Sequence, residues 1–172
     1  MNIYQIYEAG MVRRYHAKRV IQHQTIGEHT WGVCMLIYWL YYPNKPPQEI
    51  IGRALFHDVP EIITGDVPAP AKWRSPALTE ALDGLEAMVA SELGFAEHME
   101  PHVVLSYADN VELLMYALSE VKLGNQYLLY TMEKGLGRLQ DIVPKLPSEV
   151  RPRGASLVDE LRASFNHYEA KR

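Results

Sequence analysis

Two histidines and two aspartates stand out as residues that could bind one metal ion together. They are His29, the adjacent pair His57-Asp58, and Asp109, and they lie on different predicted helices. Two imidazoles and two carboxylates give a mixed nitrogen and oxygen ligand set, which suits Zn, Mn, Co, Fe or a similar divalent ion. A His-Asp dipeptide alone is a weak signal, because chance produces one in roughly a quarter of chains with this composition.

The segment that follows the His-Asp pair strengthens the pattern. Pro60-Glu61 and Thr64-Gly65-Asp66 add acidic and turn-forming residues directly after His57. In apolar surroundings such a cluster of carboxylates would repel itself unless a cation were present. The sequence therefore predicts a divalent metal site around these residues.

Helices are predicted to position these side chains. Thr25 and Glu28 are typical of a capping box, which opens a helix that runs to Tyr42 and is apolar nearly all round, as expected for a buried, central helix. His57 and Asp58 are expected in the last turn of the next helix. Residues 65–70 cannot continue a helix, because they contain a glycine and two prolines. The apolar pattern predicts helices over 3–12, 48–58, 76–93, 103–123, 126–143 and 149–169, and no strand, so the expected fold class is all-α.

Length and composition set limits on the protein class. With 172 residues, positions 1–172 are expected to form a single compact domain with one core. The net charge of −4 argues against a nucleic-acid partner held by a broad basic face. The single cysteine, Cys34, excludes an internal disulfide and fits a reducing compartment. The chain start lacks a signal-peptide pattern and residues 31–42 are too short to span a bilayer, so a cytoplasmic protein without a membrane partner is expected.

Several segments together resemble the HD-domain metal-dependent phosphohydrolases. They are Glu28-His29, residues 54–61 with the sequence ALFHDVPE, residues 64–68 with Lys72, and Ala108-Asp109. The most similar branches are the bacterial 5′-deoxynucleotidases and the small dATP triphosphohydrolases of phages with diaminopurine DNA. The resemblance implies an HD-type helical bundle and a metal cofactor, most readily Zn, Co or Mn, with Mg or Fe as further options. The implied metal ligands are His29, His57, Asp58 and Asp109.

The same resemblance implies roles for the remaining site residues. Glu61 would orient or deprotonate the attacking water, and Asp66 would lie near that water and the sugar. Arg14 can bind two phosphate oxygens at once, whereas Lys72 would act as a point charge. Such cations suit phosphate-ester hydrolysis, in which negative charge develops on the oxygens in the transition state. The residues expected to face the nucleobase are Tyr15, Ala17, Gln24 and Pro70.

Two substrates remain open, since both activities break the bond between the α-phosphorus and the 5′ oxygen. A 5′-deoxynucleotidase releases phosphate from deoxynucleoside monophosphates, whereas a dATP triphosphohydrolase releases deoxyadenosine and triphosphate. We favour the triphosphohydrolase, because the basic residues of segment 13–19 and Lys72 offer spare positive charge for the outer phosphates. Gln24 and the segment that starts at Pro68 are also more similar to the phage branch. A catalytically inactive HD module that only binds nucleotide is the third possibility.

The expected partners follow from these activities. A small deoxynucleotide is the expected ligand, in the cytoplasm, or in the host cytoplasm if a phage encodes the chain. The resemblance implies a homo-oligomer, a dimer in one branch and a hexamer in the other. Apolar residues of the closing helices, including Tyr127 and Tyr130, offer a surface for such an interface.

Overall fold

The computed structural model describes residues 3–171, apart from the side chain of Trp73. Within these residues the only strand-like pairing is an isolated bridge between Arg13 and Thr25, so the all-α prediction is confirmed. The α-helices are α1 (Ile3–Ala9), α2 (Ile26–Tyr41), α3 (Gln48–Phe56), α4 (Glu61–Thr64), α5 (Ala69–Arg74), α6 (Pro76–Leu93), α7 (Val103–Lys122), α8 (Leu129–Ile142) and α9 (Arg151–Ala170). Short 3-10 turns are η1 (Ala96–His98), η2 (Gln126–Leu128) and η3 (Val143–Lys145).

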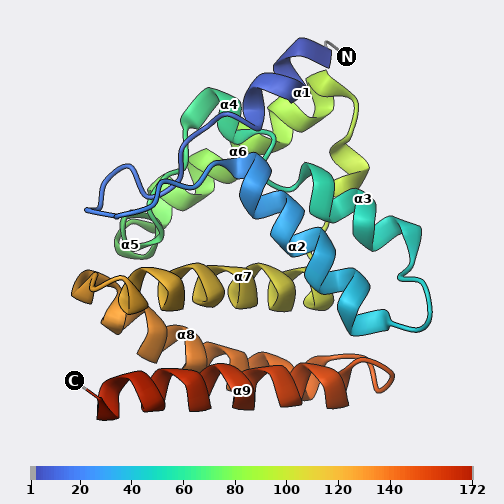
Figure 1. Ribbon diagram of the computed structural model, residues 1–172. Helices are drawn as coiled ribbons and strands as arrows, with labels where there is room; N and C mark the ends of the chain where they lie inside the picture. Colours follow the sequence, from blue (N-terminus) through green and yellow to red (C-terminus); the bar gives the residue numbers. More distant parts are fainter. Residues whose placement is uncertain (1–2, 172) are drawn as a thin grey trace.

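Helix α7 is the centre of the fold (Figure 1), because α2 and α3 pack on one side of it and α8 and α9 on the other. Its side chains Tyr107, Val111 and Leu114 are fully buried in the main core. A smaller apolar cluster that includes Ala9, Val89 and Phe95 joins α1 to α6. No helix in the described part of the chain is both long and apolar enough to cross a membrane.

Helix α2 differs from its prediction as a wholly buried helix. Val33 and Ile37 are fully buried, whereas Trp31 is 69% exposed and Met35 and Tyr38 are each 49% exposed. The prediction is wrong for this outer face, since α2 lies against α7 and α3 on one side only. An apolar composition therefore does not by itself place a helix at the centre of the fold.

Local signals at helix ends are confirmed where they involve capping side chains. The Thr25 hydroxyl accepts a hydrogen bond from the Glu28 N–H, and the Glu28 carboxylate accepts one of 2.7 Å from the Thr25 N–H. This capping box fixes the start of α2. Helix α6 has the predicted bounds, with the Ser75 hydroxyl capping its first turn.

Other predicted bounds are corrected by the structure. Helix α3 ends at Phe56, so that His57 caps it and Asp58 lies in the following turn, not in the last turn of the helix. Helix α1 ends at Ala9, three residues before the predicted end at 12. Helix α4 ends before Gly65, as predicted for segment 65–70. Pro70, however, belongs to α5, a helix that was not predicted and in whose first turn a proline is tolerated.

The segment between α1 and α2, residues 10–25, is tied to the end of α7. Glu120 is fully buried and accepts hydrogen bonds of 2.7 and 2.6 Å from the backbone N–H groups of Ile21 and Gln22. The Asn125 amide donates to the same carboxylate at 2.7 Å and to the Arg19 carbonyl at 2.9 Å. These bonds hold the basic part of the segment over the helix that also carries Asp109.

Candidate active site

Three of the predicted metal ligands form a compact group. His29 comes from the first turn of α2, and His57 and Asp58 come from the end of α3. One ligand atom from each residue lies within 4.8 Å of the other two. The Nε2 atoms of both histidines are buried without a hydrogen-bond partner. Orphaned buried nitrogens beside a carboxylate fit a divalent ion, which would satisfy all three groups at once.

Asp109 approaches the group from α7. Its Oδ1 lies 3.3 Å from Nε2 of His29, and Oδ2 of Asp58 lies 3.5 Å from the same nitrogen. Asp109 is outside the set whose atoms all lie within 4.8 Å, and its side chain is 40% exposed to the cavity beside it. Desolvation raises the pKa of Asp109, but the adjacent His29 imidazole and nearby cations outweigh it and lower the pKa to about 2. The four predicted ligands are therefore gathered in one place, with Asp109 ionised.

Each histidine of the group has a partner for its second nitrogen. His57 donates from Nδ1 to the Ala54 carbonyl at 2.8 Å, and His29 donates from Nδ1 to Oε2 of Glu112 at 2.5 Å. Such partners fix the ring and direct Nε2 toward the metal position. Burial lowers the pKa of His29, but the adjacent carboxylates of Asp109 and Glu112 outweigh it and raise the pKa to about 9. A metal ion therefore competes with a proton for His29, since only the neutral imidazole nitrogen binds metal.

Glu61 and Asp66, the two predicted catalytic residues, line the cavity next to this group. Glu61, at the start of α4, is 9% exposed, and its Oε2 is buried without a hydrogen-bond partner. Desolvation, and then the charges of Asp58 and Asp66, raise the pKa of Glu61 to about 9. A carboxyl group with a strongly raised pKa in a cavity is a candidate acid or base. Asp66 follows Gly65, whose φ of 67° is in the left-handed region that favours glycine.

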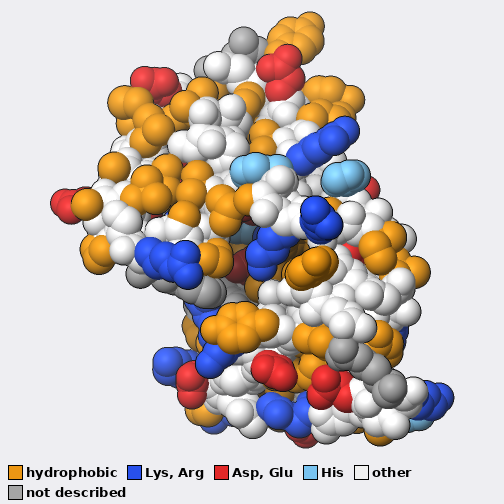
Figure 2. Space-filling view, turned by 90° about the vertical axis from the view of Figure 1, so that its left-hand side faces the viewer, with side chains coloured by type: hydrophobic (Ala, Val, Ile, Leu, Met, Phe, Trp, Pro, Cys, Tyr) orange, Lys and Arg blue, Asp and Glu red, His pale blue; other side chains and the backbone are white. Residues whose placement is uncertain are grey.

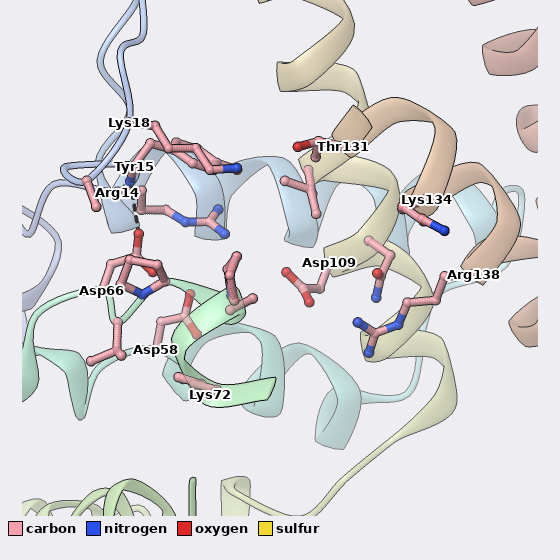
Figure 3. Close-up of a pocket in the computed structure, with 18 of the residues that line it drawn as sticks. Arg14, Tyr15, Lys18, Asp58, Asp66, Lys72, Asp109, Thr131, Lys134 and Arg138 are labelled. Carbon is pink, nitrogen blue, oxygen red and sulfur yellow. Dashed lines mark hydrogen bonds between the residues drawn. The ribbon is translucent and has the colours of Figure 1, made fainter. Parts of the chain in front are cut away.

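A cavity of about 340 Å³ opens beside the metal group. Figure 2 shows the surface hollowed between the upper and lower parts of the molecule, with Lys and Arg side chains gathered around the hollow. Asp58 and Asp109, labelled in Figure 3, both line the cavity at the end next to Nε2 of His29. Most of the predicted site residues line it, namely Arg14, Tyr15, Ala17, Asp58, Glu61, Asp66, Pro70, Lys72 and Asp109.

The predicted nucleobase residues divide into two groups. Tyr15, Ala17 and Pro70 line the cavity, and the Tyr15 ring stacks on that of Tyr116 with centroids 4.5 Å apart. Gln24 lies elsewhere: it is buried, and its amide donates to Glu112 at 2.6 Å and accepts from Arg14 at 3.3 Å. The structure thus brings the first three residues together and places Gln24 behind Arg14.

Sequence reasoning missed two features of the site. Lys134 and Arg138 of α8 line the cavity on the side opposite Tyr15 and Asp66 (Figure 3), although their spacing is that of ordinary surface charges on a helix. Glu112 had a usable signal, because it follows Asp109 by three residues and so shares its helix face within an apolar segment.

Comparisons with known proteins agree with this geometry. A profile of YfbR-like 5′-deoxynucleotidases matches residues 3–151. The chain is 30% identical to the dATP triphosphohydrolase of cyanophage S-2L, over 81% of this chain and 84% of that protein. It is 29% identical to a 5′-deoxynucleotidase of Pasteurella multocida, over 67% of this chain and 72% of that protein.

Solved structures give the same result. The cyanophage S-2L HD phosphohydrolase, bound to dA and one catalytic Zn²⁺ ion, superposes with a TM-score of 0.66 and 26% identity, covering 100% of this chain and 98% of that one. An HD-domain phosphohydrolase from Listeria innocua, 18% identical with a TM-score of 0.69 over 99% of this chain and 97% of that one, shares the fold. The metal-binding group, the match over most of the chain and these relatives together support hydrolysis of deoxynucleotides, and the chain belongs to the YfbR-like family of HD-domain phosphohydrolases.

Proposed function

We propose that this protein is a dATP, or more broadly dNTP, triphosphohydrolase that releases a deoxynucleoside and triphosphate. The observation that carries the proposal is the set of basic side chains lining the cavity. Beyond Arg14 and Lys72, which one phosphate would occupy, it contains Lys18, Lys134 and Arg138. Each added phosphate group calls for further cationic contacts, so this excess of positive charge fits a triphosphate.

The cavity has two chemically different ends. The carboxylates Asp58 and Asp109 lie toward the metal group, whereas Lys134 and Arg138 extend from α8 on the far side of Asp109 (Figure 3). Neither α8 side chain forms an ion pair with a carboxylate of residues 3–171. A chain of phosphates that starts at the metal group would meet these cations, whereas a lone phosphate would not.

We assign the chemical roles accordingly. His29, His57, Asp58 and Asp109 would hold the divalent ion, which lowers the pKa of water and acts as a Lewis acid when bound. Glu61 would take the proton of the attacking water, because its Oε2 is the one carboxylate oxygen among the described residues that is buried without a hydrogen-bond partner. A cation bound beside Asp58 would lower the raised pKa of Glu61 and so leave it ionised as a base.

The substrate contacts follow from the lining of the cavity. Arg14 binds non-bridging oxygens of the α-phosphate and stabilises their charge in the transition state, with Lys72 as a further cation. Tyr15, Ala17 and Pro70 form the wall against which the base packs.

The alternative activity is that of a 5′-deoxynucleotidase. The matching family profile and the relative from Pasteurella multocida favour it. In that case the α8 cations would have no phosphate to bind. The inactive module that only binds nucleotide is disfavoured, because the orphaned atoms of His29, His57 and Glu61 are all retained.

The test is the hydrolysis rate of the purified protein on dATP and on dAMP, with Zn, Co or Mn and with a chelator. We expect metal-dependent turnover of dATP that exceeds turnover of dAMP and is abolished in Asp58→Ala. Turnover of dAMP alone would make the protein a 5′-deoxynucleotidase. Binding of nucleotide without turnover under any metal would favour the inactive module.

Assembly and location belong to the same proposal. We propose a homo-oligomer, since the large side chains of Trp31, Tyr38 and Tyr127 are each about half or more exposed. A cytoplasmic location is proposed because the single cysteine fits a reducing compartment. Light scattering is expected to give a molar mass of at least a dimer. A stable monomer at micromolar concentration would contradict the proposed oligomer.

A further inference from the structure

Glu112 is a buried carboxylate that joins two parts of the site. Its Oε2 accepts from Nδ1 of His29 at 2.5 Å and from Nη1 of Arg14 at 3.4 Å, and its Oε1 accepts from Nε2 of Gln24 at 2.6 Å. Glu112 is 8% exposed and His29 is fully buried. One side chain thus contacts both a proposed metal ligand and the proposed phosphate-binding arginine.

The surroundings of Glu112 are built to hold this side chain. A Cβ atom added to Gly32 of α2 would lie 2.9 Å from Cγ of Glu112, so a larger residue there would displace the carboxylate. Gln24 bridges Glu112 and Arg14, because its carbonyl oxygen accepts from Arg14 while its amide donates to Glu112. The arginine therefore cannot reorient without breaking contacts to both residues.

The contact with His29 determines which nitrogen faces the metal group. Because Nδ1 donates its proton to Glu112, Nε2 is left at the centre of the site, where it is buried without a partner and lies 3.3 Å from Asp109. Asp109 and Glu112, three residues apart on α7, thus bracket the imidazole from the same helix face. Carboxylates that hold a metal-bound histidine in this way contribute to metal affinity.

We propose that Glu112 is the positioning residue that aligns His29 for metal binding and Arg14 for phosphate binding, so that both functions depend on one carboxylate. This inference rests on the metal and phosphate sites of the proposed function, but on neither choice of substrate. It assigns Gln24 to the same network as the link between Glu112 and Arg14.

The test measures the two binding functions separately, without turnover. Metal-free protein is titrated calorimetrically with Zn²⁺ or Co²⁺, and in a second experiment with dAMP, whose phosphate either activity must hold. We expect Glu112→Gln to lower metal affinity about 10- to 100-fold and to weaken dAMP binding as well. Arg14→Ala is the matched control, expected to weaken dAMP binding while metal affinity stays within about twofold.

Two further readouts separate positioning from mere packing. In the Arg14→Ala background, Glu112→Gln should no longer weaken dAMP binding but should still lower metal affinity. Long-range ¹H–¹⁵N spectra of the histidine rings should show the His29 proton on Nδ1 at a pH above its titration, and a mixture of tautomers in Glu112→Gln. Unchanged tautomer and metal affinity in a folded Glu112→Gln protein would overturn the inference.

A second variant covers the case in which Glu112→Gln does not fold. Gly32→Ala keeps the charge but pushes the carboxylate aside, so we expect the same paired loss of metal and dAMP affinity. Affinities equal to those of the unsubstituted protein would overturn the inference. Failure of wild type to bind dAMP would instead count against the proposed function, while the metal titrations would still test Glu112.

Discussion

The backbone N–H of Tyr15 donates a hydrogen bond of 2.9 Å to Oδ2 of Asp66, 51 residues along the chain. Tyr15 has a φ of 59°, which costs a non-glycine residue about 1–3 kcal/mol and persists only where the surroundings hold it in place. The stacked ring of Tyr116 and the carboxylate of Asp66 supply that support. The Gly-Asp turn therefore sets the position of the cavity wall as well as placing an acidic group near the metal site.

Asp66→Ala removes this acceptor, so the segment carrying Arg14 and Tyr15 should relax. We expect the KM for the nucleotide to rise about tenfold and the free energy of unfolding to fall by about 1–2 kcal/mol. Steady-state kinetics and urea denaturation measure the two effects. Asp159→Ala, at an exposed position of α9, is the control and should change neither. An unchanged KM in Asp66→Ala would show that the wall does not depend on this bond.

Glu61→Gln should reduce kcat at least about 100-fold, because the water loses its general base. It should also change the pH dependence of stability in the metal-free protein. The fold raises the pKa of Glu61 from 4.5 to about 9, so the stability linked to this group is full below pH 4.5 and is lost as pH rises toward 9. Gln does not titrate, and the variant should lose less stability between pH 5 and 9.

Melting curves in a chelator at a series of pH values test this prediction. The melting temperature of wild type should fall more steeply with pH than that of Glu61→Gln, with Glu160→Gln, an exposed substitution on α9, behaving as wild type. Parallel curves for wild type and Glu61→Gln would mean that the fold does not disfavour the ionised carboxylate of Glu61.

The double substitution of Lys134 and Arg138 by Ala should separate the substrates. We expect the KM for dATP to rise about tenfold or more, since two cations facing the outer phosphates are lost, while kinetics with dAMP stay within about twofold. Added salt should also raise the KM of wild type for dATP more than its KM for dAMP, because salt screens the additional cations. Lys122→Ala, at an exposed position of α7 outside the cavity, is the control. Equal losses with dATP and dAMP would remove the assignment of α8 to the outer phosphates.

Local sequence signals predicted the helices that they cap, whereas tertiary contacts decided the rest. The Thr25-Glu28 capping box and the Ser75-Pro76 start of α6 depend only on neighbouring residues, and both are confirmed. The outer face of α2 and the early end of α3 at Phe56 depend on which elements pack nearby, and their predictions failed. Periodicity reports that a face is apolar but not whether another element covers it.

The candidate site shows the same division. The resemblance indicated His29, Asp58 and Asp109, and the structure gathers them although 80 residues separate the first from the last. Lys134 and Arg138 could not be predicted, because a surface charge becomes part of a site only through the packing of α8 against α7. The family resemblance thus predicted the metal ligands, whereas only the structure showed that these two cations line the cavity.

Glu120→Ala should destabilise the protein and free the basic segment. The N–H groups of Ile21 and Gln22 would lose the fully buried carboxylate that accepts their hydrogen bonds, at a cost of about 1.5–3 kcal/mol for each bond to this charged group. Urea denaturation measures the loss, and limited digestion with trypsin should cut at residues 13–19 faster than in wild type. Cutting at the wild-type rate would show that other contacts hold the segment.

The most direct test of the account is the identity of the products released from dATP. Phosphorus NMR of the metal-loaded reaction distinguishes inorganic triphosphate from pyrophosphate and monophosphate, while chromatography identifies the nucleoside. The account predicts deoxyadenosine and intact triphosphate in equal amounts, with neither product formed by Asp58→Ala. Release of pyrophosphate or single phosphates from dATP, or phosphate from dAMP alone, would contradict it.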